Sequence, residues 1–204
     1  MIRFAAVSAL ALLSLAACER TDDPVAEPPS AAAHPSRETA PPTPGAHVVA
    51  GEGLNAVRIG MTRAEVVGQW GEDSAPDAAG GPDPAACDEF HPAKASAGVN
   101  VMIQNGVLTR ITLMRDAAVK TDRGFGVGDS GMAIKEAYGG AIFAQPHKYE
   151  PAPAENLFAW SRGGSSAYVT DPTARGVRYE VGTEGKVTLV HAGDPSIQLV
   201  EGCS

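Results

Sequence analysis

The stretch Gly60–Gly71, which reads GMTRAEVVGQWG, carries the strongest fold signal of the chain because a second version of it occurs further on. That second version, GDSGMAIKEAYG, spans Gly128–Gly139, so the offset is 128 minus 60, or 68. A fixed offset that continues into the following residues predicts a duplicated supersecondary unit. The residues that it pairs include Ile59 with Val127, Thr62 with Ser130, Val66 with Ile134, Trp70 with Tyr138, Phe90 with Phe158 and Val101 with Val169.

Each of the two stretches predicts a short, capped helix. Thr62 and Ser130 are N-cap residues, whose hydroxyl oxygens accept from free amides of the first turn. Thr62 with Glu65 also forms a capping box. Gly71 and Gly139 suit the position just after a helix. Because helices this short are marginal alone, we expect both to pack on the strands that follow.

The segments after each helix read as strands. Val99–Gln104 and Val107–Leu113 alternate apolar and polar residues around Asn105-Gly106, which predicts a hairpin with a two-residue turn. In the second half, aligning Gly106 with Gly185 needs an offset of 185 minus 106, or 79, in place of 68, which predicts an insertion there. The remaining expected strands are Cys87–His91, Asn156–Trp160, Ser166–Thr170, Val177–Val181 and Val187–Val190.

The fold class that follows is α+β. We predict two tandem repeats, each a short helical segment packed on an antiparallel sheet of about three to four strands. The first repeat covers residues 51–121 and the second covers residues 122–204.

The N-terminus predicts export. Met1-Ile2-Arg3 precedes an apolar run, Phe4–Leu15, that is long enough for a signal peptide and short for a membrane span. Residues 1–17 are therefore expected to be removed. Leu15-Ala16-Ala17-Cys18 resembles the lipobox of bacterial lipoproteins, which makes Cys18 the expected lipidation site, with palmitate among its acyl chains. The alternative is an ordinary secretory signal that happens to carry a cysteine.

The lipoprotein interpretation has consequences for location. Lipoprotein sorting implies delivery to the outer membrane by default, and Glu19 follows the cysteine where aspartate is the usual retention signal. Residues 18–50 are rich in proline and poor in large apolar residues, so we expect a disordered tether. The expected product is an outer-membrane lipoprotein that faces the periplasm and touches the membrane only through its lipid anchor.

The charge of the chain narrows its partners. Its 204 residues carry a formal net charge of −8. An acidic protein is a poor partner for nucleic acid and for an anionic lipid surface. We therefore expect no nucleic acid among its partners.

Two cysteines remain after Cys18. Cys87 and Cys203 form an even pair, and an oxidising periplasm favours a disulfide between them. In the chain-entropy description such a long loop stabilises the fold by about 4 to 5 kcal/mol. The alternative is a redox-active or nucleophilic cysteine, although the chain has no CxxC motif.

Catalytic patterns are weak. Gly128-Asp129-Ser130-Gly131 looks like a protease nucleophile signature, but the repeat puts Ser130 in the capping role of Thr62. Two groups of residues could in principle hold a metal ion, although neither has the spacing of a known zinc motif. These groups are Asp88, Glu89 and His91, and His147 with Glu150. We expect no catalytic residues, no metal and no cofactor.

The repeated pattern resembles two known families. Ile59-Gly60-Met61-Thr62 to Gly71, and Val127-Gly128-Asp129-Ser130 to Gly139, are similar to the tandem unit of the β-lactamase inhibitory protein and to the single unit of the SmpA/OmlA outer-membrane assembly lipoproteins. The resemblance covers roughly Asn55 to Cys203. It implies helices packed on antiparallel sheet and a protein that binds other proteins.

The expected binding surface lies where the duplication is interrupted, because loops on a rigid scaffold commonly carry function. The candidate binding residues are Gln145, His147, Lys148, Tyr149 and Arg175. The leading hypothesis is a protein-binding module of the cell envelope, either an assembly accessory or an inhibitor, whose partner is an envelope protein. The alternative is a periplasmic hydrolase or metal-dependent enzyme that uses the histidine and acidic residues.

Overall fold

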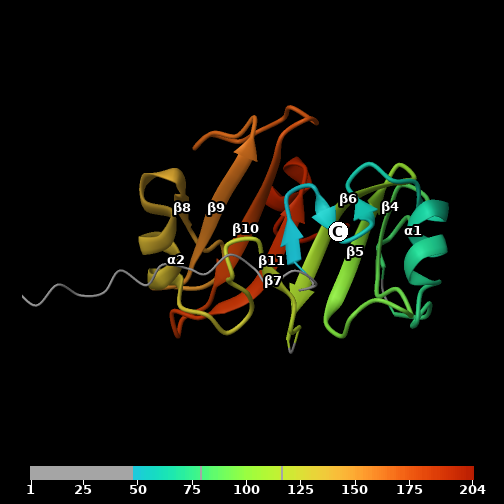
Figure 1. The fold of residues 1–204 in the computed structure, drawn as a ribbon, viewed down its shortest axis with the longest axis horizontal. Coiled ribbons are helices and arrows are strands. Elements are labelled where there is room, and N and C mark those ends of the chain that lie inside the picture. The colour runs from blue at the N-terminus through green and yellow to red at the C-terminus, as the bar shows by residue number, and fades with distance from the viewer. Residues whose placement is uncertain (1–47, 79, 116) are drawn as a thin grey trace, which may run out of the picture. The chain divides into compact units, whose positions relative to one another are not determined.

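A seven-stranded antiparallel sheet in the order β4-β5-β6-β11-β10-β9-β8 forms the framework (Figure 1). The computed structural model describes residues 48–78, 80–115 and 117–204, so residues 1–17, Cys18 and nearly all of the expected tether lie outside the described part. The strands of this sheet are β4 (Cys87–Phe90), β5 (Val99–Gln104), β6 (Val107–Met114), β8 (Phe143–Pro146), β9 (Glu155–Arg162), β10 (Arg175–Val181) and β11 (Val187–Gly193).

Helices α1 (Arg63–Trp70) and α2 (Gly131–Tyr138) begin at the expected caps. The Thr62 hydroxyl accepts from the amide of Glu65 at 3.3 Å, and the Glu65 carboxylate accepts from the amide of Thr62 at 2.8 Å. This is the predicted capping box. The Ser130 hydroxyl accepts from the amide of Ala133 at 3.5 Å. The fold is therefore mixed α+β with mostly sheet, and no helix in the described ranges is long and apolar enough to cross a membrane.

A second, smaller sheet has the order β3-β2-β1-β7 and was not expected from the sequence. Strand β1 begins at Val48, so the last three residues of the range expected for the tether belong to the fold. Val49 of this strand is fully buried in the core. β1 pairs in parallel with β7, so residues 48–49 lie beside residues 120–121. The bounds are β1 (Val48–Ala50), β2 (Gly53–Leu54), β3 (Val57–Arg58) and β7 (Lys120–Thr121).

The hydrophobic core lies on one face of the large sheet. Val66 of α1, Ile134 of α2 and Val49 of the small sheet pack with apolar residues of that face. Because successive strand residues point to opposite faces, the residues between them form the other face. That face carries buried polar side chains and contacts the 3₁₀-helix η2 (Pro195–Gln198).

Each helix is attached to a hairpin by the same hydrogen bonds. The amide of Gly60 donates to Leu108 at 2.7 Å, and the amide of Gly128 donates to Val187 at 2.8 Å. One turn further on, Arg63 donates to Gly106 and Gly131 donates to Gly185, both at 3.0 Å. We call residues matched when they make the same contact in the two halves. The matched hairpin residues differ by 187 minus 108, or 79, which is the offset expected for the hairpin turn.

Matched β-bulges extend the correspondence into the strands. The register shifts between Met102 and Ile103 in β5, and between Glu180 and Val181 in β10. These positions differ by 180 minus 102, or 78. Bulges re-aim side chains locally, so an equal bulge in both hairpins keeps the same residues on the core face.

The expected pairing of Phe90 with Phe158 is off by one residue. Phe90 pairs with Val101, and Leu157 pairs with Tyr179, so Phe90 is matched to Leu157. Phe90 and Leu157 both belong to the core, whereas Phe158 lies on the opposite face. A shift of one residue in a strand reverses the face, so the core selects the true register.

The expected strand Ser166–Thr170 is absent from the described structure, and Val169 lies in a loop. β9 pairs directly with β10, so the inserted segment forms the connection between them. Phe90 of β4 and Leu157 of β9 differ by 157 minus 90, or 67, whereas Val101 of β5 and Tyr179 of β10 differ by 179 minus 101, or 78. The sequence offset between the two halves therefore increases by 11 residues between these strands, as it does between the expected offsets of 68 and 79. The segment between β9 and β10 contains no strand in the described structure, and it lies before the hairpin strand rather than within the hairpin.

The predicted disulfide between Cys87 and Cys203 is present, with the two Cα atoms 5.4 Å apart. It ties the end of the chain to β4, across a sequence separation of 116 residues. Because η2 lies a few residues earlier, the bond also holds this cover in place over the polar face of the sheet.

Candidate functional site

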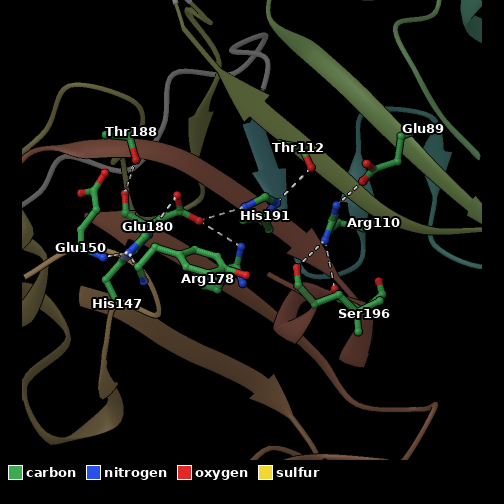
Figure 2. A network of polar contacts seen from close by, with 12 residues as sticks. Glu89, Arg110, Thr112, His147, Glu150, Arg178, Glu180, Thr188, His191 and Ser196 are labelled. Atoms are coloured by element: carbon green, nitrogen blue, oxygen red, sulfur yellow. Dashed lines mark hydrogen bonds and ion pairs between the residues drawn. The ribbon is translucent and has the colours of Figure 1, made fainter. Parts of the chain in front are cut away.

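A buried polar network occupies the face of the large sheet opposite the core (Figure 2). Glu180 of β10 is its centre, with Arg178, His147 and His191 around its carboxylate. Neighbouring strands place these groups together, because Arg178 pairs with His191, and His191 pairs with Thr112 of β6. The network therefore spans three strands and one loop.

Arg178 carries a deeply buried charge. Its side chain is 1% exposed, and its Nη2 donates to Glu180 Oε2 at 3.2 Å. Burial lowers the pKa of Arg178 to about 10, while Glu180 opposes this effect. Its Nε and Nη1 have no hydrogen-bond partner among the described residues. A buried guanidinium with one acceptor depends strongly on that acceptor.

Arg110 of β6 forms a second centre in the same face. Its guanidinium bonds the carboxylate of Glu89 and donates to the carbonyl oxygens of Ser196 at 3.2 Å and Leu199 at 3.0 Å. Burial lowers the pKa of Arg110, and Glu89 opposes this effect. Arg110 thus links β4 and β6 to η2, which fixes the C-terminal segment on the sheet.

His147 is held as one tautomer. Its Nδ1 accepts from the backbone amide of Tyr149 at 3.2 Å and from that of Glu150 at 3.0 Å. In the neutral imidazole the proton is therefore on Nε2. Nε2 faces Glu180 Oε1 at 3.5 Å. With both lone-pair and proton positions used, His147 cannot ligate a metal in this arrangement. The ring instead stabilises the loop that follows β8.

Thr112, His191 and Glu180 lie in the order of a nucleophile, base and acid. The Thr112 hydroxyl is 3.0 Å from His191 Nδ1, and His191 Nε2 is 3.9 Å from Glu180 Oε2. The second distance is too long for a hydrogen bond. Thr112 is only 6% exposed. A nucleophile must be reachable by the atom that it attacks, and Thr112 is buried. The three residues therefore have the composition of a catalytic triad, but the histidine and the acid are too far apart and a substrate cannot reach the hydroxyl.

His191 makes stability depend on pH. Burial, with Arg178 and Arg110 nearby, lowers the pKa of His191 well below 6.5. The unfolded imidazole then takes up a proton below about pH 6.5 that the folded one excludes, so the free energy of unfolding should fall as pH falls through this range. The slope for one group approaches about 1.4 kcal/mol per pH unit. Urea denaturation between pH 7 and pH 5 measures it. His191→Gln should flatten the curve, and an unchanged slope would contradict the assignment.

Four of the five predicted binding residues lie in one region. Lys148 Nζ is 2.6 Å from Glu201 Oε1, and the Tyr149 hydroxyl bonds the same carboxylate. Gln145 lies in β8 and donates to the carbonyl of Ser166 at 3.5 Å. His147 lies with Lys148 and Tyr149 in the loop after β8, but its side chain is turned inward and is only 8% exposed.

Arg175, the fifth predicted residue, lies elsewhere. It begins β10, donates to the carbonyl oxygens of Pro172 and Ala174, and has its Nε 3.6 Å from Glu52 Oε2. These contacts hold the start of a strand and the turn between β1 and β2. The structure thus separates Arg175 from the other four candidates.

The C-terminal surface, as we name it, consists of Tyr149, Tyr168, Leu199 and Glu201. Tyr149 is 62% and Tyr168 is 66% exposed. The Gln198 side chain accepts from the amide of Val169 at 2.9 Å and donates to its carbonyl at 2.8 Å, which fixes the loop of Tyr168 on η2. A shallow pocket of about 320 Å³ lies beside Tyr168 and is also lined by Pro172 and Leu199.

A larger pocket of about 470 Å³ lies on the core side of the sheet, next to the end of α2. The hydroxyls of Tyr138 and Tyr179 are hydrogen-bonded at 2.9 Å, and Arg123 lies over the Tyr138 ring at 5.1 Å. Tyr179 donates in turn to Thr121. Burial raises the pKa of Tyr138. We call this the α2 pocket, and its lining also includes Gly51, Glu52, Asp122, Ala141, Trp160, Ser161 and Arg162.

Asp88, Glu89 and His91, the first of the two candidate metal-binding groups, make contacts within the fold. Asp88 pairs with Arg63 at 2.5 Å, Glu89 pairs with Arg110, and His91 Nδ1 lies 2.6 Å from the carbonyl of Val99. Within the described ranges there is no group of three histidine, cysteine or acidic residues placed to hold a metal ion. These side chains therefore have partners within the fold.

The sequence did not single out Arg110, Arg178 and His191 as site residues. Each is a charged or titratable residue inside a strand and is followed by an apolar or aromatic residue, and this pattern could have marked a buried polar face. The signal is ambiguous, because the same alternation is typical of a strand with a solvated face.

Comparison with known proteins finds a distant structural neighbour. No family model matches the chain, and no curated protein matches it. The chain is similar to the crystal structure of a DUF4309 family protein, YjgB, from Bacillus subtilis subsp. subtilis str. 168. The identity is 12%, the TM-score is 0.44, and the match covers 71% of this chain and 88% of that chain. A likeness at this level indicates no function.

Proposed function

We propose that the protein is an envelope lipoprotein that binds another envelope protein and performs no catalysis. The lipobox ending at Cys18 and the proline-rich residues 18–50 support lipid anchoring at the outer membrane, facing the periplasm. The alternative is a periplasmic hydrolase or metal-dependent enzyme. It has less support, because His147 Nδ1 already accepts from two backbone amides and Thr112 is buried.

Two tandem repeats are part of this proposal. The matched hydrogen bonds of Gly60 and Gly128, and the matched bulges of β5 and β10, support a duplication that ran through residues 51–121 and 122–204. Duplicated folds of this kind present loops on a common framework. The insertion before β10 makes the second half different, and it supplies Tyr168.

The observation that carries the binding function is the exposure of Tyr149, which bonds Glu201, and of Tyr168, which lies beside Leu199. Tyrosine is enriched in protein interfaces, since it offers a large amphipathic area at low entropic cost. The loops beneath both residues are already ordered by Gln198, Glu201 and the disulfide. A partner would therefore meet a surface that loses little conformational entropy on binding.

In-cell crosslinking tests this surface. A photoreactive residue at Tyr149 or Tyr168 should capture the same envelope protein, whereas one at Met132 should not. Met132 is a matched control because it is 68% exposed and belongs to α2. Tyr168→Ala should reduce binding of the captured protein at least ~10-fold, as expected for a central interface residue. Equal capture from Met132 would contradict the proposed surface.

A further inference from the structure

The two helices end in different surroundings. After α1, the segment Pro92–Ala95 crosses the helix end: the amide of Lys94 donates to the carbonyl of Trp70 at 2.7 Å, and the amide of Ala93 donates to Glu72 at 2.8 Å. A Cβ placed on Gly71 would lie 3.3 Å from Lys94 Cγ. The first helix end is therefore covered by the chain itself.

The end of α2 continues into the 3₁₀-helix η1 (Gly139–Ala141), and no segment that follows a strand crosses it in the described structure. A Cβ placed on Gly139, which is matched to Gly71, would meet nothing within 4 Å, and the same holds for Gly140. The two helix ends differ because β4 and β9 end differently. β4 ends at Phe90 and the chain then turns over α1, whereas β9 continues to Arg162 and stays paired with β10.

The α2 pocket lies between the end of α2 and the straight end of β9. Its walls are Tyr138 and Ala141 at the helix end, and Trp160 and Ser161 on the strand that ran straight. Tyr138 is matched to Trp70, the residue whose carbonyl is covered in the first half. The pocket therefore lies where the first half places a short piece of its own chain.

The wall opposite α2 is fixed before any ligand arrives. A Cβ placed on Gly51 would lie 2.6 Å from the amide nitrogen of Gly176, so the turn between β1 and β2 packs directly on the backbone of β10. Glu52 in that turn lies 3.5 Å from Arg162 and 3.6 Å from Arg175. A preformed pocket loses less free energy on binding than one that must be ordered.

We propose that the α2 pocket binds a short peptide segment of a partner protein, in the place that Pro92–Ala95 takes on α1. The occupant is chemically like that segment: a few residues with small side chains and a proline that turns the main chain. The site is separate from the C-terminal surface, so the proposal goes beyond the function proposed above, and either one can fail without the other.

A peptide titration tests the pocket. The probe is an N-acetylated, C-amidated peptide with the sequence of Phe90–Ser96, FHPAKAS, added to the full-length ¹⁵N-labelled chain in detergent. Saturable amide shift changes at Gly51, Ala141 and Ser161 are expected, with a dissociation constant on the order of 1 mM, because a short free peptide lacks the tether that holds the same segment on α1.

Two controls make the result decisive. A peptide of the same composition with a scrambled order should bind at least ~10-fold more weakly, which corresponds to about 1.4 kcal/mol. Ala141→Trp, which fills the pocket from the helix side, should abolish the shifts, and Ser161→Tyr does the same from the strand side if the first variant misfolds. Equal binding of both peptides, or unchanged shifts in a folded filled variant, would overturn the proposal. Pocket shifts that depend on protein concentration without peptide would identify a second copy as the occupant instead and would also overturn it.

Discussion

Glu180→Gln is expected to lower the free energy of unfolding by about 3 kcal/mol or more, the range typical of a broken buried ion pair. Arg178 is almost fully buried, and Glu180 supplies its acceptor. Removing one partner of a buried ion pair leaves the other charge uncompensated, and such changes typically cost about 3 to 5 kcal/mol. Equilibrium urea denaturation of the purified chain measures the effect. Glu184→Gln, in the exposed turn between β10 and β11, should leave the midpoint close to that of the wild type.

The double variant Arg178→Met with Glu180→Leu separates charge from packing. Replacing both partners with apolar residues removes the charges together, so most of the lost stability should return. If Glu180→Gln unfolded at the wild-type midpoint, the charge of Arg178 would not depend on Glu180, and the prediction would be wrong. If the double variant were as unstable as the single one, packing and the contacts of Glu180 with His147 and His191 would matter more than the charge of Arg178.

Removal of the disulfide is the second large expected effect. Cys87→Ser with Cys203→Ser should lower the free energy of unfolding by about 4 to 5 kcal/mol, because the bond closes a loop of more than about 100 residues in the unfolded chain. Denaturation of the variant under oxidising conditions measures this loss. Reduced wild-type protein should show the same midpoint as the double variant, which serves as the control for the substitutions. A midpoint equal to that of the oxidised wild type would contradict the effect.

Much of the framework is readable from local sequence. Thr62, Glu65 and Ser130 mark helix starts because a cap requires a specific oxygen at a specific distance along the chain. Asn105-Gly106 marks a hairpin because few residue pairs accept the backbone angles of its turn, and Asn105 and Gly106 both have positive φ. The pairing of Cys87 with Cys203 followed from assigning Cys18 to lipid, which leaves two cysteines for an oxidising compartment.

The remaining parts depend on contacts between distant residues. β1, β2, β3 and β7 are two or three residues long, so they have no periodicity to detect, and only the packing of Val49, Leu54 and Val57 defines them. The register of Phe158 depended on which face the core occupies. The polar network needed three strands side by side, since Arg178, His191 and Thr112 are neighbours only across the sheet.

The predicted binding residues show the same limit. Sequence placed Gln145, His147, Lys148, Tyr149 and Arg175 in loops, and loops are a reasonable expectation for function. Sequence could not show that His147 turns inward to Glu180, or that Arg175 lies with Glu52. Tyr168 was not singled out, because it lies within the expected strand Ser166–Thr170, which the structure replaces by a loop.

The pairing of β6 with β11 joins the two halves at the middle of the large sheet. β11 is the last strand of the chain, so β6 has no partner on that side until residues 187–193 have been synthesised. Such late, long-range pairing is slow, and an unpaired central strand is a template for association with other chains. A nascent or truncated chain that lacks β11 would therefore expose the interior of its own sheet as a sticky edge, and quality control during biogenesis would have to shield it until the C-terminus arrives.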